Sequence, residues 1–163
     1  MRIAWINQIN NNSVIMETDA IIPCKSIAEY QIGWTYEQLT EYLPYNYKVE
    51  ELELGKKISC DNFSFWINNI TGTIDQISAK SNFSGKFEGK IGLGSTLKDI
   101  EQFFGKWEED LDVYIIPQYK GLCFEIKDVE DFDEEWIEDQ MPINVISVYD
   151  PDETEKDENE FPE

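Results

Sequence analysis

The chain has 163 residues, of which 41% are hydrophobic and 13% aromatic, and its formal net charge is −21. This length predicts one domain, and the apolar content excludes a chain that is disordered throughout. The charge excludes nucleic acid and anionic membranes as direct partners, because both repel a strongly negative surface. No run approaches the roughly 18 apolar residues of a membrane-spanning helix, and the N-terminus lacks the apolar core and cleavage site of a secretory signal.

The cysteine and histidine content limits the chemistry that the chain can perform. Its three cysteines, Cys24, Cys60 and Cys123, are widely spaced and form no C-x-x-C pair, which predicts reduced thiols in a cytoplasmic protein. The chain has no histidine, so histidine-assisted nucleophiles and nearly all histidine-containing metal sites are excluded. No local motif activates a cysteine. We therefore expect a protein that is not an enzyme and that has no metal or cofactor.

Negative charge is concentrated in the last third of the chain. Residues 1–107 hold 13 acidic and 10 basic side chains, a net charge of −3, whereas residues 108–163 hold 21 acidic and 3 basic side chains, a net charge of −18. A field of one sign steers oppositely charged proteins into contact. The pattern predicts a basic protein partner, although solubility alone would also account for it.

The first predicted elements form a β-hairpin. Residues 1–8 and 14–22 read as strands, the cluster Asn10–Ser13 between them favours a turn, and Pro23 ends the second strand.

Two short amphipathic helices are predicted further along the chain. Thr35 caps the first helix, which ends before Pro44, and Thr96 caps the second, with Asp99 as its partner in a capping box and Gly105 as its end. Each helix places four apolar side chains at positions i, i+3, i+6 and i+7 on one face. These are Tyr36, Leu39, Tyr42 and Leu43 in the first helix, and Leu97, Ile100, Phe103 and Phe104 in the second.

The remaining elements are predicted strands, and together with the helices they indicate an internal repeat. The strands cover residues 47–54, 56–60, 63–67, 74–80, 113–116, 122–126 and 143–149. A shift of 61 residues lays Ile32-Gly33-x-Thr35 over Leu93-Gly94-x-Thr96 and aligns the apolar positions of both helices. We infer an α+β fold with two degenerate repeats of a short helix followed by an antiparallel β-meander, preceded by the N-terminal β-hairpin. The repeats span about 27–84 and 87–149 of a single domain, 1–150, and residues 151–163 form an acidic disordered tail.

The second repeat contains an inserted acidic loop. Phe65 and Ile77 are 12 residues apart, whereas their counterparts Phe124 and Ile146 are 22 apart. The insertion carries aromatic side chains among carboxylates, which is the composition of a protein-binding hot spot. The competing interpretation is that the aromatic residues pack on the sheet and only the acids face water. The predicted partner-binding residues are Asp128, Glu130, Asp131, Phe132, Asp133, Glu134, Glu135, Trp136, Glu138 and Asp139, with Glu108, Glu109, Asp110 and Asp112 as acidic neighbours.

Other site motifs are rejected. Gly89, Gly92 and Gly94 fit neither the dinucleotide-binding pattern nor a Walker loop, so they are interpreted as turn glycines. The acidic loop has no glycine for the sharp turn of an EF-hand, and no glycine follows Gly121. Paired carboxylates for glycoside hydrolysis stay possible, but nothing singles out one pair.

Three segments resemble small bacterial immunity proteins that accompany polymorphic and contact-dependent growth inhibition toxins. They are Gly85-Lys-Phe-Glu-Gly-Lys-Ile-Gly-Leu-Gly-Ser-Thr-Leu-Lys-Asp-Ile-Glu-Gln-Phe-Phe-Gly105, Tyr119-Lys-Gly-Leu-Cys-Phe-Glu125 and Pro142-Ile-Asn-Val-Ile-Ser-Val148. The resemblance covers roughly residues 60–150 and concerns fold-determining positions. It implies a cytoplasmic inhibitor that binds one cognate toxin, often a nuclease, and blocks its active site. No binding residue is carried over from the family.

The expected function is therefore an immunity protein that covers the active site of a basic toxin with an acidic surface. The alternatives are a carboxylate-based hydrolase and a non-catalytic scaffold or assembly module. The repeat architecture also resembles that of β-lactamase inhibitory proteins and small outer-membrane assembly lipoproteins. Those proteins are secreted or lipidated, and the lack of a signal or lipobox cysteine counts against that assignment.

Overall fold

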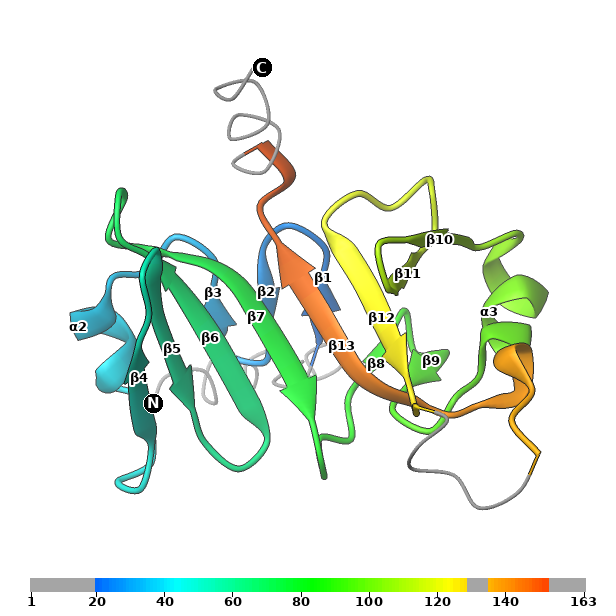
Figure 1. Ribbon diagram of the computed structural model, residues 1–163, viewed down its shortest axis with the longest axis horizontal. Coiled ribbons are helices and arrows are strands. Elements are labelled where there is room, and N and C mark those ends of the chain that lie inside the picture. The colour runs from blue at the N-terminus through cyan, green and yellow to red at the C-terminus, as the bar shows by residue number, and fades with distance from the viewer. Residues whose placement is uncertain (1–19, 129–134, 153–163) are drawn as a thin grey trace, which may run out of the picture.

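The computed structural model describes residues 20–128 and 135–152 and shows an α+β fold of mostly antiparallel sheet with few helices (Figure 1). Its centre is an eight-stranded sheet in the order β10-β11-β12-β13-β7-β6-β5-β4, in which every neighbouring pair is antiparallel. The strands are β4 (Lys48–Glu51), β5 (Gly55–Ser59), β6 (Phe63–Asn68), β7 (Ile74–Lys80), β10 (Glu108–Asp110), β11 (Val113–Ile115), β12 (Leu122–Ile126) and β13 (Ile143–Tyr149).

Smaller elements cover one face of this sheet and its two ends. A three-stranded sheet and a two-stranded sheet lie behind the large sheet in the view of Figure 1, and the two α-helices lie at its opposite ends. These elements are β1 (Ile21–Ile22), β2 (Ser26–Ile27), β3 (Tyr30–Gln31), β8 (Lys86–Phe87), β9 (Ile91–Gly92), α2 (Tyr36–Thr40), α3 (Leu97–Phe104) and the 3-10 turn η2 (Glu138–Gln140). In the part of the chain that the structure describes, no helix is long and apolar enough to cross a membrane.

The predicted strands of the large sheet are confirmed, although the longest of them, 47–54, covers only Lys48–Glu51 in the structure. The expected strands at 74–80, 122–126 and 143–149 match β7, β12 and β13 in both bounds. The predicted N-terminal hairpin falls largely outside the described residues, and its last two residues, Ile21–Ile22, form β1 and pair with Ser26–Ile27. The acidic strand β10 is not among the predicted strands, because its side chains are exposed and show no apolar alternation.

Both predicted helix caps form. The Thr35 hydroxyl accepts from the Gln38 amide at 3.2 Å, and the Thr96 hydroxyl accepts from the Asp99 amide at 3.2 Å, each with the reciprocal bond of a capping box.

The predicted apolar faces of both helices need correction. Helix α2 ends at Thr40, so Tyr42 and Leu43 lie beyond it, and Tyr42 is 37% exposed. In the second helix the Phe103 side chain is 46% exposed.

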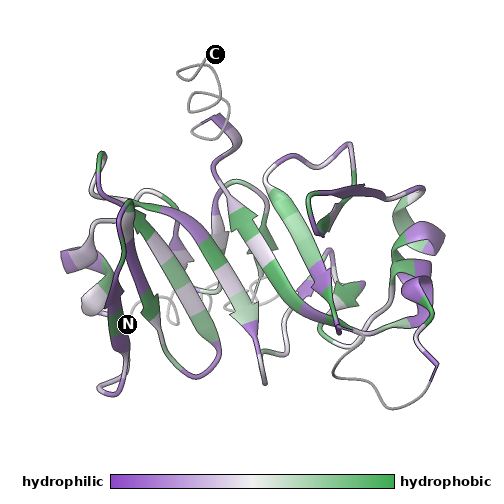
Figure 2. Cartoon of the chain, in the orientation of Figure 1, coloured by the Kyte–Doolittle hydropathy of each residue, from purple (hydrophilic) through white to green (hydrophobic). Residues whose placement is uncertain are grey.

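The core lies between the large sheet and the smaller sheets behind it. Hydrophobic and polar residues alternate along the central strands (Figure 2), so most of the buried apolar side chains lie on one face of the sheet. The Tyr30 ring packs against Phe65 at 4.8 Å between ring centroids, and the Phe87 ring packs against Tyr119 at 5.0 Å. The fully buried large side chains are Phe65, Phe87, Phe124, Ile27, Leu39, Ile58, Ile74, Ile77, Ile91, Leu97, Ile100 and Ile116.

Corresponding backbone contacts precede each helix. Gly33 and Gly94 have φ values of 94° and 95°, which favour glycine. The Gly33 amide donates to the Ile74 carbonyl at 2.8 Å, and the Gly94 amide donates to the Ile143 carbonyl at 2.9 Å. The first contact ties the segment before α2 to the start of β7, and the second ties the segment before α3 to the start of β13.

Candidate acidic pocket

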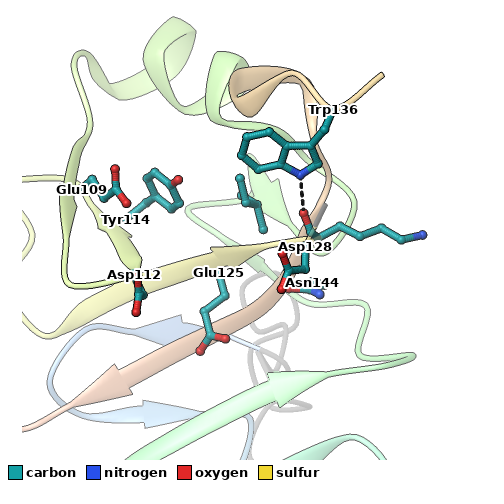
Figure 3. Close-up of a pocket in the computed structure, with 9 residues that line it drawn as sticks. Glu109, Asp112, Tyr114, Glu125, Asp128, Trp136 and Asn144 are labelled. Carbon is teal, nitrogen blue, oxygen red and sulfur yellow. Dashed lines mark hydrogen bonds between the residues drawn. The ribbon is translucent and has the colours of Figure 1, made fainter. Parts of the chain in front are cut away.

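Carboxylates from separate segments meet at one pocket of about 500 Å³. The pocket lies between the β10–β11 hairpin, the end of β12 and the segment that precedes η2 (Figure 3). Four carboxylates, a phenol and an indole line it, those of Glu109, Asp112, Glu125, Asp128, Tyr114 and Trp136, together with one basic residue, Lys127. Folding therefore brings the predicted acidic neighbours Glu109 and Asp112 next to Asp128 and Trp136 of the inserted loop.

A strained turn presents one of these carboxylates. Asp110 pairs with Val113, so Leu111 and Asp112 form a two-residue hairpin loop, and their φ values are 51° and 76°. Positive φ at both central positions is the pattern of a type I′ turn, which favours Asn-Gly and disfavours Leu. The Leu111 side chain is 90% exposed, so no burial compensates for this backbone. The turn therefore places a strained apolar tip beside the Asp112 carboxylate.

Trp136 is held against the end of β12. Its indole N–H donates to the Lys127 carbonyl at 3.0 Å, and its side chain is half-buried (Figure 3). The ring therefore contacts the protein and also lines the pocket, and both interpretations of this tryptophan stay predictions.

A second bond ties the segment after Trp136 to the sheet. The Tyr114 hydroxyl donates to Glu138 Oε2 at 2.7 Å, which joins β11 to η2. Burial, followed by this bond to a carboxylate, raises the pKa of Tyr114. The Glu138 carboxylate therefore has a structural contact inside the protein.

The other predicted binding residues are distributed as follows. Asp128 and Glu135 are exposed, whereas Glu138 and Asp139 are half-buried. Glu108 and Asp110 are exposed on the edge strand β10. Glu130, Asp131, Phe132, Asp133 and Glu134 lie outside the described residues.

Glu125 is a pocket residue that the sequence reasoning missed. Its side chain is half-buried, and burial raises its pKa while the charge of Lys57 opposes the shift. The alternation in β12 contains the signal, because Glu125 follows the buried Phe124 and must face the opposite side of the sheet. Its neighbours on other strands depend on strand register, which the sequence did not provide.

Among the described residues, no thiol is activated as a nucleophile and no metal-ligating side chains are clustered to hold a metal ion. Burial raises the pKa of Cys123 to about 12, and burial also raises the pKa values of Cys24 and Cys60. A raised pKa keeps a thiol protonated and poorly nucleophilic. Within residues 20–128 and 135–152, no group of three or more Cys, Asp or Glu side chains is placed to hold a metal ion.

Comparisons with protein-family models, with curated proteins and with solved structures found no match. Function is therefore inferred from the chemistry of the pocket.

Proposed function

We propose that the protein is an immunity protein that binds a basic bacterial toxin and neutralises it by covering its active site. The observation that carries this proposal is the pocket of Glu109, Asp112, Glu125 and Asp128, in which an indole lies among four carboxylates. Carboxylates pair with Lys and Arg of a partner. An aromatic ring that becomes buried in the interface supplies contact area that slows dissociation.

The partner class follows from charge. A nuclease binds phosphate through a basic active site, and a carboxylate can form a bidentate pair with a guanidinium there. The net charge of −21 speeds association with such a protein. The resemblance of residues 85–105 to immunity proteins supports the same assignment and a cytoplasmic location.

The fold proposal is the internal repeat. In each half a capped helix precedes four antiparallel strands, and β7 pairs with β13 where the two halves meet. The register shifts also correspond, one between Trp66 and Ile67 and the other between Glu125 and Ile126. In this proposal the loop in which the second copy differs from the first contributes Asp128 and Trp136 to the pocket.

A carboxylate-based hydrolase is a second candidate, and Glu125 is the observation that favours it. A carboxyl group with a raised pKa beside other carboxylates is the arrangement of an acid–base pair. A hydrolase would turn over a substrate in a screen of glycosides and esters, and Glu125→Gln would abolish that turnover. An immunity protein would show no turnover.

Affinity capture followed by a growth test examines the proposal. The tagged protein is incubated with cytosol of its native cells at low and at high salt, and bound proteins are identified by mass spectrometry. We expect one basic protein that is retained at low salt, released by high salt, toxic when expressed alone and harmless when co-expressed with this chain. A neutral or acidic partner, or a partner with no toxicity, contradicts the proposal.

The role of Trp136 has its own test with the same partner. Trp136→Ala should weaken binding more than truncation after Asp150, because the indole lines the pocket while the truncation removes none of its lining residues. An equal or larger loss on truncation would move the interface away from the pocket.

A further inference from the structure

The face of the large sheet opposite the small sheets carries a second groove. A pocket of about 370 Å³ extends over β5, β6, β7, β12 and β13. Cross-strand pairing places Ser64, Ser78, Ser147 and Cys123 side by side on this face, and Ser64 and Ser78 line the groove. The hydroxyls of Ser78 and Ser147 form a hydrogen bond with each other at 2.7 Å, and Ser147 is only 1% exposed. This pair of side chains is therefore fixed and already satisfied in its hydrogen bonds.

Larger side chains form one wall along this face. Trp66, Gln76 and Tyr149 are cross-strand neighbours on one side. The Trp66 ring lies over Gly55 of the adjacent strand, where an added Cβ would come within 2.8 Å of Trp66 Cζ2. The missing side chain of Gly55 thus lets the indole lie flat on the sheet, where it lines the groove.

The groove carries side chains of both charges. Lys57 and Lys80 come from β5 and β7, whereas Glu125 comes from β12. Val145 of β13 lies between Lys80 and Glu125 in the pairing, so two strand spacings of about 4.8 Å separate their backbones by about 10 Å. Among the residues that the structure describes, these three charged groups form no ion pair with one another or with other residues.

We propose that this groove binds an extended segment of a protein partner that presents Arg or Lys to Glu125 and Asp or Glu to Lys57 and Lys80. The 10 Å separation corresponds to basic and acidic residues two to four positions apart in an extended chain. The carboxylates of the adjacent acidic pocket repel a phosphate backbone. A net charge of −21 opposes a second copy of this chain as the occupant.

Identifying that partner as the toxin rests on the proposed function. The expectation that the groove binds a segment with both charges rests only on the groove residues. Glu125 lines both the groove and the acidic pocket, so one partner can occupy the two sites together.

A phage-displayed library of random 12-residue peptides, selected on the immobilised full-length protein, tests the groove without the toxin. We expect enriched peptides with one basic and one acidic residue two to four positions apart. Synthetic versions should bind Glu125→Gln and Lys80→Gln about tenfold or more weakly than wild type, because each change removes a charged contact. The control variant Glu101→Gln, on the exposed face of α3, should change affinity less than twofold.

Three results overturn the groove proposal. They are no enrichment over an empty surface, peptides that bind wild type and Glu125→Gln equally, and a concentration-dependent dimer that Glu125→Gln disrupts. Failure of the proposed function is separate from all three. If peptides with one basic and one acidic residue bind in a way that depends on Glu125 and Lys80, but no toxic basic partner is captured, the groove proposal stands and the immunity proposal fails. If a toxic basic partner is captured and its binding does not change with either substitution, the immunity proposal stands and the groove proposal fails.

Discussion

Leu111→Asn should make the protein more stable, although it removes a large apolar side chain. Leu111 adopts a φ of 51° in the two-residue turn between β10 and β11. A left-handed conformation costs roughly 1–2 kcal/mol for an ordinary L-residue, and Asn adopts it far more readily. Because the Leu111 side chain is 90% exposed, almost no buried apolar area is lost. The expected gain in the free energy of unfolding is about 1 kcal/mol, which raises Tm by roughly 2–4 °C in a chain of this size.

Urea denaturation, followed by tryptophan fluorescence, measures this gain against a matched control. Leu54→Asn makes the same chemical change in the β4–β5 turn, where the side chain is 72% exposed and the backbone φ is not positive. That control should change stability by less than about 0.5 kcal/mol. If Leu111→Asn raises the free energy of unfolding no more than Leu54→Asn does, the turn is not strained and Leu111 does not destabilise the fold.

Three further predictions concern the site and the helices. Tyr114→Phe and Glu138→Gln, measured singly and together by denaturation, should show a coupling energy of about 1 kcal/mol, and additive losses would mean that the bond is not made in solution. Glu125→Gln should raise stability near pH 7: the folded-state pKa lies above the ordinary 4.5, so the native state favours the protonated carboxyl group and is penalised once the pH rises through that pKa. Denaturation across pH should show this gain disappearing below about pH 4, and a wild type that is more stable at pH 7 would contradict the burial of the carboxylate. Thr35→Ala and Thr96→Ala should each cost about 1 kcal/mol and add within about 0.5 kcal/mol in the double variant, whereas a negligible cost at either site would contradict that cap.

Much of the sheet was predictable because long strands carry a strong pattern. Strands β7, β12 and β13 alternate or concentrate β-branched and aromatic residues, and their predicted bounds match the structure. The helix starts were predictable for a different reason, since a capping box is a local signal that needs no tertiary contact.

The missed elements depend on pairing and not on local pattern. Strand β10 is an exposed acidic edge that exists because Glu108–Asp110 pairs with β11. The two-residue strands β2 and β3 are too short to show any periodicity.

The candidate site was predictable in composition but not in arrangement. The acidic loop and its tryptophan were apparent from charge and length, and the sequence named Glu109 and Asp112 as neighbours. The groove beside it joins Lys57, Lys80 and Glu125 from three strands whose sequence separation reaches 68 residues. Such a juxtaposition follows from strand order and register, which local sequence patterns do not determine.

The most direct measurement of the central claim is the dissociation constant of the captured basic partner for two variants of equal charge. One variant combines Glu109→Gln, Asp112→Asn and Asp128→Asn in the pocket, and the other combines Glu37→Gln, Glu41→Gln and Glu53→Gln in the first half of the chain. We predict that the pocket variant weakens binding about tenfold or more at low salt, whereas the control stays within about threefold of wild type. Equal losses in the two variants would show that only the overall charge attracts the partner, and no loss in either would contradict the acidic interface.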